Sequence, residues 1–228
     1  MDTVKFVGDL AVRENDKRTA AGKTLFYRAG KRTFDVVASL AGLVVLAPVF
    51  LMTAIAIFVE SGGPVFYSQK RIGRNKEIFS MYKFRSMQKN ADEIHENLRK
   101  QYDCTEVSFK LREDPRITKV GKIIRNLNID ELPQLWNVVK GDMSIVGPRP
   151  LPDYEFRQEQ EKYGGRYDER YSVPQGLTCY WQISDRSSVN FEDRMKMDVE
   201  YTKEKSPFTD FKLIVKTALL TITGKASY

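Results

Sequence analysis

The sequence predicts an α/β fold of the α+β type, mostly helical with a small sheet, attached to a membrane by one re-entrant helix broken at Pro48. An apolar run, Val36–Val59, contains no charged residue. Short segments rich in β-branched and aromatic residues follow it, and windows with helical periodicity make up much of the rest. Hydrophobic residues at 42% and aromatic residues at 11% exclude an intrinsically disordered chain.

The charge and the few reactive side chains narrow the function classes. A formal net charge of +7 favours an anionic partner: nucleic acid, an anionic membrane surface or a phosphorylated substrate. Cys104 and Cys179 have no metal-ligand spacing, so we expect reduced thiols in a cytosol-facing protein. His95, the one histidine, lies in a polar stretch. A Ser-His-Asp hydrolase and a histidine zinc cluster are therefore excluded.

The apolar run reaches the length of a helix inserted in lipid, about 20 residues for a full span. It stands alone, which excludes a polytopic transporter. Pro48 removes a backbone donor in its middle and predicts a kink. Positive residues mark the cytoplasmic side, and a helix that enters and leaves by one face leaves both basic flanks there. A straight bitopic anchor is the alternative. The flanking basic residues are Arg28, Lys31 and Arg32 before the run, and Lys70, Arg71 and Arg74 after it.

Beyond the apolar run, turn, strand and helix signals alternate. Gly62, Gly63 and Pro64 predict a turn. The expected extended segments are Val65–Gln69 and Ile78–Arg85, and the expected helices are Ala91–Gln101, Gly121–Asn126 and Asp153–Tyr163.

Two further helices follow from apolar periodicity. One carries an apolar face at Leu132, Leu135, Trp136 and Val139 and ends at Gly141. The other, Phe208–Ile222, is amphipathic: Phe211, Ile214, Val215, Ala218 and Ile222 oppose Lys212 and Lys216. Such a helix lies in a membrane interface or covers the core, and the residues leave both open. Between the two, the prolines of Gly147–Pro150 predict a rigid loop.

The adjacent carboxylates Asp130 and Glu131 are the main candidates for chemistry. Pro133 predicts a helix that begins near Asp130, where free N–H groups and the helix dipole favour a phosphate. A carboxylate there can attack phosphorus, hold Mg²⁺ or only cap the helix. The pair alone leaves all three open.

Cationic residues near this pair in the sequence favour phosphate chemistry. Lys83 and Arg85 lie in YKFRSM, Arg125 precedes Asp130 by one turn or more, and Arg149 lies in the stiff GPRP loop. Arginine donates in bidentate fashion to phosphate oxygens, and breaking a diphosphate bond needs such positive charge. The sequence contains no Walker loop and no GxGxxG, so an ordinary P-loop or Rossmann phosphate site is excluded.

The chain contains several longer sequence motifs: KRTFD at 31–35, GGPVFYSQKRIGR at 62–74, YKFRSM at 82–87 and GKIIRNLNIDELPQLWNVVKGDMSIVGPRP at 121–150. From Lys31 to about Tyr201 the chain resembles the bacterial sugar transferase family, the monotopic polyprenyl-phosphate phosphoglycosyl transferases, in their small form. Departures occur at Ala47, where the family usually has serine, and at Gln175, Cys179 and Asp185.

The resemblance implies an activity and roles for residues. A sugar-1-phosphate passes from a UDP-sugar to polyprenyl (undecaprenyl) phosphate with release of UMP, the first membrane step of exopolysaccharide, capsule or glycan assembly. Asp130 becomes a covalent phosphosugar-aspartyl intermediate, and Glu131 assists by holding Mg²⁺ or managing a proton. The cofactor is Mg²⁺, with Asp130 and Glu131 as its ligands. The residues assigned to substrate phosphates are Lys83, Arg85, Arg125, Arg149 and Arg186, and those assigned to the nucleotide and sugar region are Pro148, Thr178 and Gln182.

The resulting expectation has three segments: an N-terminal arm at 1–30, a re-entrant membrane helix at 31–60 and a catalytic domain at 61–228. It places the protein at the bacterial cytoplasmic membrane, docked on the inner leaflet with the catalytic domain facing the cytoplasm and without a nucleic-acid partner. Two readings compete with the enzyme. One is a non-catalytic, membrane-anchored basic module that binds anionic partners, and the other is a nucleic-acid binder, against which the apolar segment argues.

Overall fold

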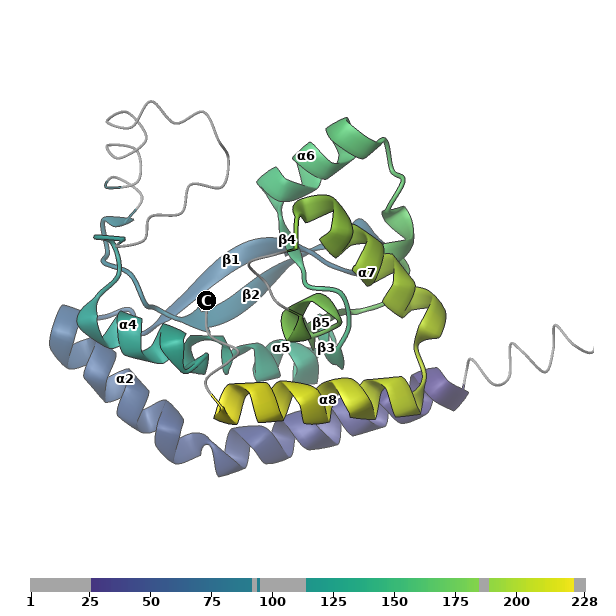
Figure 1. Cartoon of the computed structure of the whole chain (residues 1–228). Coiled ribbons are helices and arrows are strands. Elements are labelled where there is room, and N and C mark those ends of the chain that lie inside the picture. The colour runs from purple at the N-terminus through teal and green to yellow at the C-terminus, as the bar shows by residue number, and fades with distance from the viewer. Residues whose placement is uncertain (1–25, 92–93, 95–113, 185–188, 224–228) are drawn as a thin grey trace, which may run out of the picture.

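The computed structural model describes residues 26–91, 94, 114–184 and 189–223. Helices dominate, and the strands form two small sheets, as the sequence predicted. A bent pair of apolar helices runs along one side of the molecule with α8 (Pro207–Ile222) beside it, and the sheets lie above them (Figure 1). His95, Cys104, Arg186 and nearly all of the predicted helix Ala91–Gln101 lie outside the described residues.

The apolar segment forms two helices, Phe26–Val45 and α2 (Ala47–Ser61), bent by 59°. Pro48 occupies the first turn of α2, where the missing N–H leaves no helical partner unsatisfied, so the break falls two residues earlier, at Leu46. Within the described chain, no single helix is long and apolar enough to cross a membrane, whereas this bent pair meets that test when taken together. Residues 26–30, which we had assigned to the arm, belong to the first of the two helices.

A hairpin follows the predicted turn. Strands β1 (Phe66–Ile72) and β2 (Ile78–Phe84) pair antiparallel, with Phe66 opposite Phe84, and the 3-10 turn η1 (Arg74–Lys76) joins them. Strand β4 (Leu151–Pro152) pairs with the other edge of β1 and completes a sheet of order β2-β1-β4. Both extended segments that the sequence predicted are therefore confirmed.

The central helices also follow the prediction. Helix α4 is Lys119–Asn126, and the 3-10 turn η2 (Ile129–Glu131) leads into α5 (Gln134–Lys140). Gly141 ends α5 in a left-handed conformation with φ of 97°. The face of α5 that packs inward is mixed: it buries the polar side chains of Gln134 and Asn137 together with Val138. Its predicted apolar stripe is only partly buried: Leu135 packs against the first helix at Gly42, whereas Trp136 is 50% exposed.

The second sheet places the GPRP loop. Strand β3 (Met143–Val146) pairs parallel with β5 (Gln175–Thr178) after a crossover through α6 (Asp153–Tyr163) and the 3-10 turn η3 (Asp168–Ser172). Gly147 and Gly176 allow the close approach, since a Cβ on Gly176 would lie 2.1 Å from the Gly147 nitrogen. The predicted rigid loop Gly147–Pro150 thus begins pressed against the start of β5.

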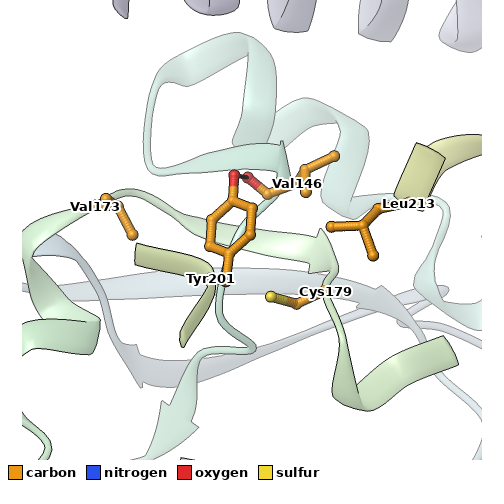
Figure 2. Close-up of a cluster of buried hydrophobic side chains, with 5 residues drawn as sticks. All are labelled: Val146, Val173, Cys179, Tyr201 and Leu213. Atoms are coloured by element: carbon orange, nitrogen blue, oxygen red, sulfur yellow. Dashed lines mark hydrogen bonds between the residues drawn. The ribbon is translucent and has the colours of Figure 1, made fainter. Parts of the chain in front are cut away.

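The C-terminal elements close the core. After η4 (Trp181–Ile183) come α7 (Phe191–Glu204), which our sequence reading did not predict, and α8. A buried cluster joins β3, α7, α8 and the residues that flank β5; its members are Val146, Val173, Cys179, Tyr201 and Leu213 (Figure 2). Because Leu213 faces this cluster, Phe211 is left 65% exposed and Val215 is also exposed. Helix α8 therefore covers the core with one face and presents apolar side chains with another.

Candidate active site

Asp130 and Glu131 lie in η2, a short turn between α4 and α5. Asn128 ends α4 with a left-handed φ of 55°, and Pro133 opens α5. The α-helix begins later than we predicted, because the amides of Glu131 and Leu132 donate to Asn128 and Ile129 inside the turn. These two amides are therefore not available to a phosphate.

Two cations hold Glu131. Lys83 Nζ donates to its Oε1 at 2.8 Å, and Arg149 donates to Oε1 at 2.6 Å and to Oε2 at 3.2 Å. All three side chains are largely buried. Burial by itself would raise the pKa of the Glu131 carboxyl, but Arg149 and Lys83 hold that pKa well below its ordinary value. Glu131 is therefore ionised at neutral pH and fixes both cations beside Asp130.

Asp130 has the opposite environment. The residue is 8% exposed, and no described residue donates a hydrogen bond to its carboxylate. Burial raises the pKa of Asp130, the nearby charge of Glu131 raises it further, and the charges of Lys83, Arg125 and Arg149 oppose both effects. A carboxylate that lacks hydrogen bonds and is partly desolvated keeps its lone pairs available, as a nucleophile requires.

The other cations assigned to phosphates lie in different places. Arg125, in the last turn of α4, acts on Asp130 through its charge. Arg85 is buried and donates to the Ser61 hydroxyl at 2.6 Å and to the Gly62 carbonyl. Arg85 thus fixes the end of α2 to the hairpin, and among the described residues no hydrogen bond or ion pair joins it to Asp130 or Glu131.

Arg71 is a residue near the site that our sequence reading noted only as a basic flank. Its Nη1 donates to the Pro150 carbonyl at 3.0 Å, so it holds the loop that carries Arg149. Burial and the charge of Arg149 lower the pKa of Arg71 to about 10. Its position beside a second basic residue, Lys70, near the end of β1 was the only signal in the sequence, and solvent-exposed strands commonly carry the same pattern.

Two of the three residues assigned to the nucleotide and sugar region, Pro148 and Thr178, lie at the same loop. The Pro148 carbonyl accepts from Gly176 N at 2.8 Å. Thr178 is buried and its hydroxyl lies 2.6 Å from that of Thr217 in α8. Gln182 is buried in η4, one residue after Trp181. The structure thus places Pro148 and Thr178 in the packing behind Arg149.

The carboxylates suit a cation that is shared with a substrate. Among residues with described positions, no three acidic, histidine or cysteine side chains gather to hold a metal. Mg²⁺ commonly takes only one or two protein carboxylates and completes its shell with phosphate oxygens and water. Asp130, which accepts no hydrogen bond from the described residues, fits such a role, whereas Glu131 already engages Lys83 and Arg149.

Comparison with known proteins decides the family. The model of the family described as bacterial sugar transferase matches residues 26–224. The chain belongs to the bacterial sugar transferase family. This is the phosphoglycosyl transferase family that the sequence motifs resembled. The matched residues include the bent helix pair, η2 and the GPRP loop.

Among related proteins of the family, the exopolysaccharide production protein ExoY of Sinorhizobium fredii is 37% identical over 202 residues, 87% of this chain and 88% of that protein. The galactosyl transferase CpsE of Streptococcus agalactiae serotype III is 43% identical over 197 residues, which cover 85% of this chain and 42% of CpsE. The undecaprenyl-phosphate galactose phosphotransferase of Salmonella typhimurium is 38% identical over 202 residues, 87% of this chain and 41% of that enzyme. This chain thus spans about two fifths of the length of CpsE and of the Salmonella enzyme.

Proposed function

We propose that this chain transfers a sugar-1-phosphate from a UDP-sugar to undecaprenyl phosphate, releases UMP and begins the assembly of an exopolysaccharide or capsule. Family membership supports the reaction class, and the names of the Salmonella relative and of ExoY support the acceptor and the pathway type. The observation that carries the proposal is the pairing of Asp130, which has no hydrogen-bond donor among the described residues, with Glu131 between two cations.

In the first step, a carboxylate oxygen of Asp130 attacks the phosphorus that bears the sugar. The bond from that phosphorus to the bridging oxygen breaks, the electron pair stays on that oxygen, and UMP leaves. An acyl phosphate that carries the sugar remains on Asp130. Lys83 and Arg149, held by Glu131, and Arg125 lie where positive charge offsets the charge that gathers on the phosphate oxygens.

In the second step, an oxygen of undecaprenyl phosphate attacks the same phosphorus. The bond to the Asp130 carboxylate oxygen breaks and the carboxylate is regenerated, while the lipid carries the diphosphate-linked sugar. A phosphate monoester has its second pKa near 6, so the attacking oxygen needs no general base at neutral pH. The covalent intermediate lets a water-soluble donor and a lipid acceptor use one site in turn.

Mg²⁺, when bound by Asp130 together with the donor's diphosphate, would supply Lewis-acid stabilisation of the leaving phosphate. The chain's own contribution is separate from that chemistry. Glu131 keeps Lys83 and Arg149 at fixed positions, and the partly desolvated setting of Asp130 strengthens every nearby charge interaction.

We further propose that the bent helix pair enters the cytoplasmic membrane and leaves it on the same side, with the catalytic domain in the cytoplasm. Arg32 in the first helix donates to the Val138 and Val139 carbonyls of α5 at 2.6 Å and 2.9 Å. At the far end, Arg85 holds Ser61 and Gly62. Both ends of the helix pair are fixed to the same domain. If the pair enters a membrane, its two ends therefore lie on the same side of that membrane.

The exposed apolar side chains are consistent with that placement. Around the bend and along α2 they include Val44, Val45, Leu51, Met52, Ile55 and Val59. Phe208, Phe211 and Leu219 extend the apolar surface onto α8, which lies beside the first helix (Figure 1). Exposed apolar surface of this extent marks a membrane or partner surface. We assign it to the inner leaflet, where the lipid acceptor meets Asp130.

A UMP-release assay tests the proposal. Purified enzyme in detergent, with Mg²⁺, undecaprenyl phosphate and a panel of UDP-sugars, is expected to release UMP from at least one donor, and Asp130→Asn is expected to lose this activity by at least about 10³-fold. Asp153→Asn removes a half-exposed carboxylate that pairs only with Arg157 on the surface, and it should keep full activity.

Other outcomes of the same assay favour the competing functions. Absence of UMP release across the panel, from folded and membrane-bound protein, would favour a non-catalytic basic module. Full activity in Asp130→Asn would leave the family reaction in place but remove its assigned nucleophile.

A further inference from the structure

The loop that carries Arg149, Gly147–Pro150, has few backbone donors with which to form hydrogen bonds of its own. Pro148 and Pro150 have no backbone N–H, so the loop Gly147–Pro150 cannot form a ladder of its own. Instead, outside groups bind its backbone. Gly147 N donates to the Thr178 carbonyl at 2.9 Å, and the Pro148 carbonyl accepts from Gly176 N at 2.8 Å. The next carbonyl along the chain, that of Arg149, has a different partner.

That partner is Arg170 of η3. Its Nη2 donates to the Arg149 carbonyl at 2.7 Å, and its Nε and Nη2 donate to Asp198 Oδ2 at 3.1 Å and 2.7 Å. The two side chains of this ion pair are 0% and 1% exposed. A buried ion pair is a poor source of stability, because the cost of removing both charges from water offsets their attraction. What this pair does supply is a donor fixed against the Arg149 backbone.

Helix α7, which carries Asp198, also binds Val146, the residue just before the loop Gly147–Pro150. Tyr201, one turn after Asp198 in α7, shares its single hydroxyl proton between Asp210 Oδ1 at 2.8 Å and the Val146 carbonyl at 3.2 Å. Figure 2 shows this hydroxyl directed at Val146. Asp198 and Tyr201 lie three residues apart and so share a face of α7. One face of α7 therefore fixes the backbone of Val146 directly and that of Arg149 through Arg170.

We infer that Asp198, Arg170 and Tyr201 are positioning residues for Arg149. The inference rests on the proposed function, and it gives two residues of the sequence DVEY at 198–201 a role in that reaction. The backbone around Arg149 is held at three successive carbonyls. That of Pro148 accepts from Gly176 N, that of Arg149 accepts from Arg170, and that of Pro150 accepts from Arg71. Misplacement of a charge-stabilising group by about 1 Å can cost a factor of about 100 in rate.

The test replaces the ion pair without leaving a buried charge. Arg170→Met with Asp198→Leu exchanges it for apolar side chains, a change that is often neutral or stabilising for folding. We expect a folded enzyme whose kcat for UMP release falls about 10-fold to 100-fold, while KM for the donor changes little. Tyr201→Phe, which removes one oxygen, is expected to lower kcat less. Thr202→Val is the matched control, because Thr202 is buried in α7 and its hydroxyl donates only to Val199.

A second background separates positioning from general damage. If the ion pair acts through Arg149, its replacement adds little further loss when Arg149 is already Lys, since contacts in one chain of interactions are not additive. The same 10-fold or greater loss in both backgrounds, or an unchanged kcat in the wild-type background, would overturn the inference.

Hydrogen exchange gives a readout that needs no turnover. The double variant is expected to raise deuterium uptake in the peptide 144–152, whereas Thr202→Val is not. Unchanged uptake there overturns the inference on its own. If the wild-type enzyme releases no UMP from any donor, the proposed function fails, and the exchange experiment still decides whether the pair holds the loop.

Discussion

At the scale of single residues, two neighbouring carboxylates have their pKa values shifted in opposite directions. Burial raises that of Asp130, while Glu131, although buried, is kept ionised by Arg149 and Lys83. Environments that move two titratable groups apart in this way commonly separate their roles. Glu131 holds the two cations, which in the proposed reaction leaves Asp130 as the nucleophile.

This separation predicts that Asp130 costs stability. A carboxyl whose folded-state pKa is raised contributes stability only below its unfolded pKa, and that contribution is lost as pH rises through the folded value. At neutral pH the charged form is therefore unfavourable in the fold. Asp130→Asn should melt at or above the wild-type temperature, with about 2–4 °C gained per 1 kcal/mol recovered. Thermal unfolding at pH 7 checks this, and a clear drop in Tm would show that the carboxylate supports the fold.

Glu131→Gln has the opposite expectation. It removes the charge that holds Lys83 and Arg149 and leaves two largely buried cations without their partner, which typically costs about 3–5 kcal/mol for a fully buried pair and less here. It also removes a negative charge that raises the pKa of Asp130. The acid limb of single-turnover UMP release should therefore move to lower pH in whatever activity remains. A limb that stays in place or moves to higher pH would contradict the assigned coupling.

Much of the site at the residue scale was predictable, because its residue types and their close neighbours in the sequence already indicate the chemistry. Adjacent carboxylates and an arginine between prolines have few ordinary explanations when they occur together, and the structure brings Glu131, Lys83 and Arg149 into contact. Arg71 and Arg170 were not predicted as parts of the site. Their contacts are with backbone carbonyls distant in sequence, and a backbone acceptor leaves no trace in residue types.

At the scale of elements, the bend at Leu46 depends on Pro48. Replacing Pro48 with Ala restores a backbone donor and removes the clash with the preceding turn, which together cost a helix interior about 3 kcal/mol or more. We expect the two helices to straighten. The distance between spin labels at positions 28 and 59 should then increase. Pro207→Ala, in the first turn of α8, is the matched control and should leave that distance unchanged. An unchanged distance in Pro48→Ala would assign the bend to contacts with the domain instead.

The exposed face of α8 carries a second element-scale prediction. If it lies in the membrane interface, a spin label at Phe211 should be reached more readily by oxygen, which dissolves in lipid, than by a water-soluble relaxation agent. A label at Gln158, exposed on α6 at the opposite side of the molecule, should show the reverse (Figure 1). Water-like accessibility at position 211 in lipid bilayers would place α8 away from the membrane.

Elements with strong local signals were predicted well. The structure confirms α6 with the bounds expected, and Gly141 ends α5. Helix α7 was not predicted, because its sequence is largely polar and its buried face mixes Met195 and Tyr201 with Asp198 and Thr202 instead of forming an apolar stripe. The pairing of β3 with β5 was also not predicted, since it joins segments separated by α6 and η3.

At the scale of the whole molecule, the apolar helices and the site form one mechanical unit. Arg32 binds the last carbonyls of α5, the helix that follows the carboxylate pair, and Asp35 accepts from Ser144 in β3 at 2.7 Å. Glu60 at the other end of the pair accepts from the first amides of α4. The elements on both sides of Asp130 are thus attached to the segment that we propose to lie in lipid, and under that proposal these attachments set the height of Asp130 above the membrane.

The most direct test of the account is to trap the intermediate. The enzyme is mixed with a UDP-sugar and Mg²⁺ without acceptor, quenched and measured by intact-protein mass spectrometry. We expect a mass increase of one sugar phosphate that maps to the peptide containing Asp130, disappears on addition of undecaprenyl phosphate, and is absent from Asp130→Asn. UMP release from the wild-type enzyme with no adduct on Asp130, or an adduct on another residue, would contradict the central claim.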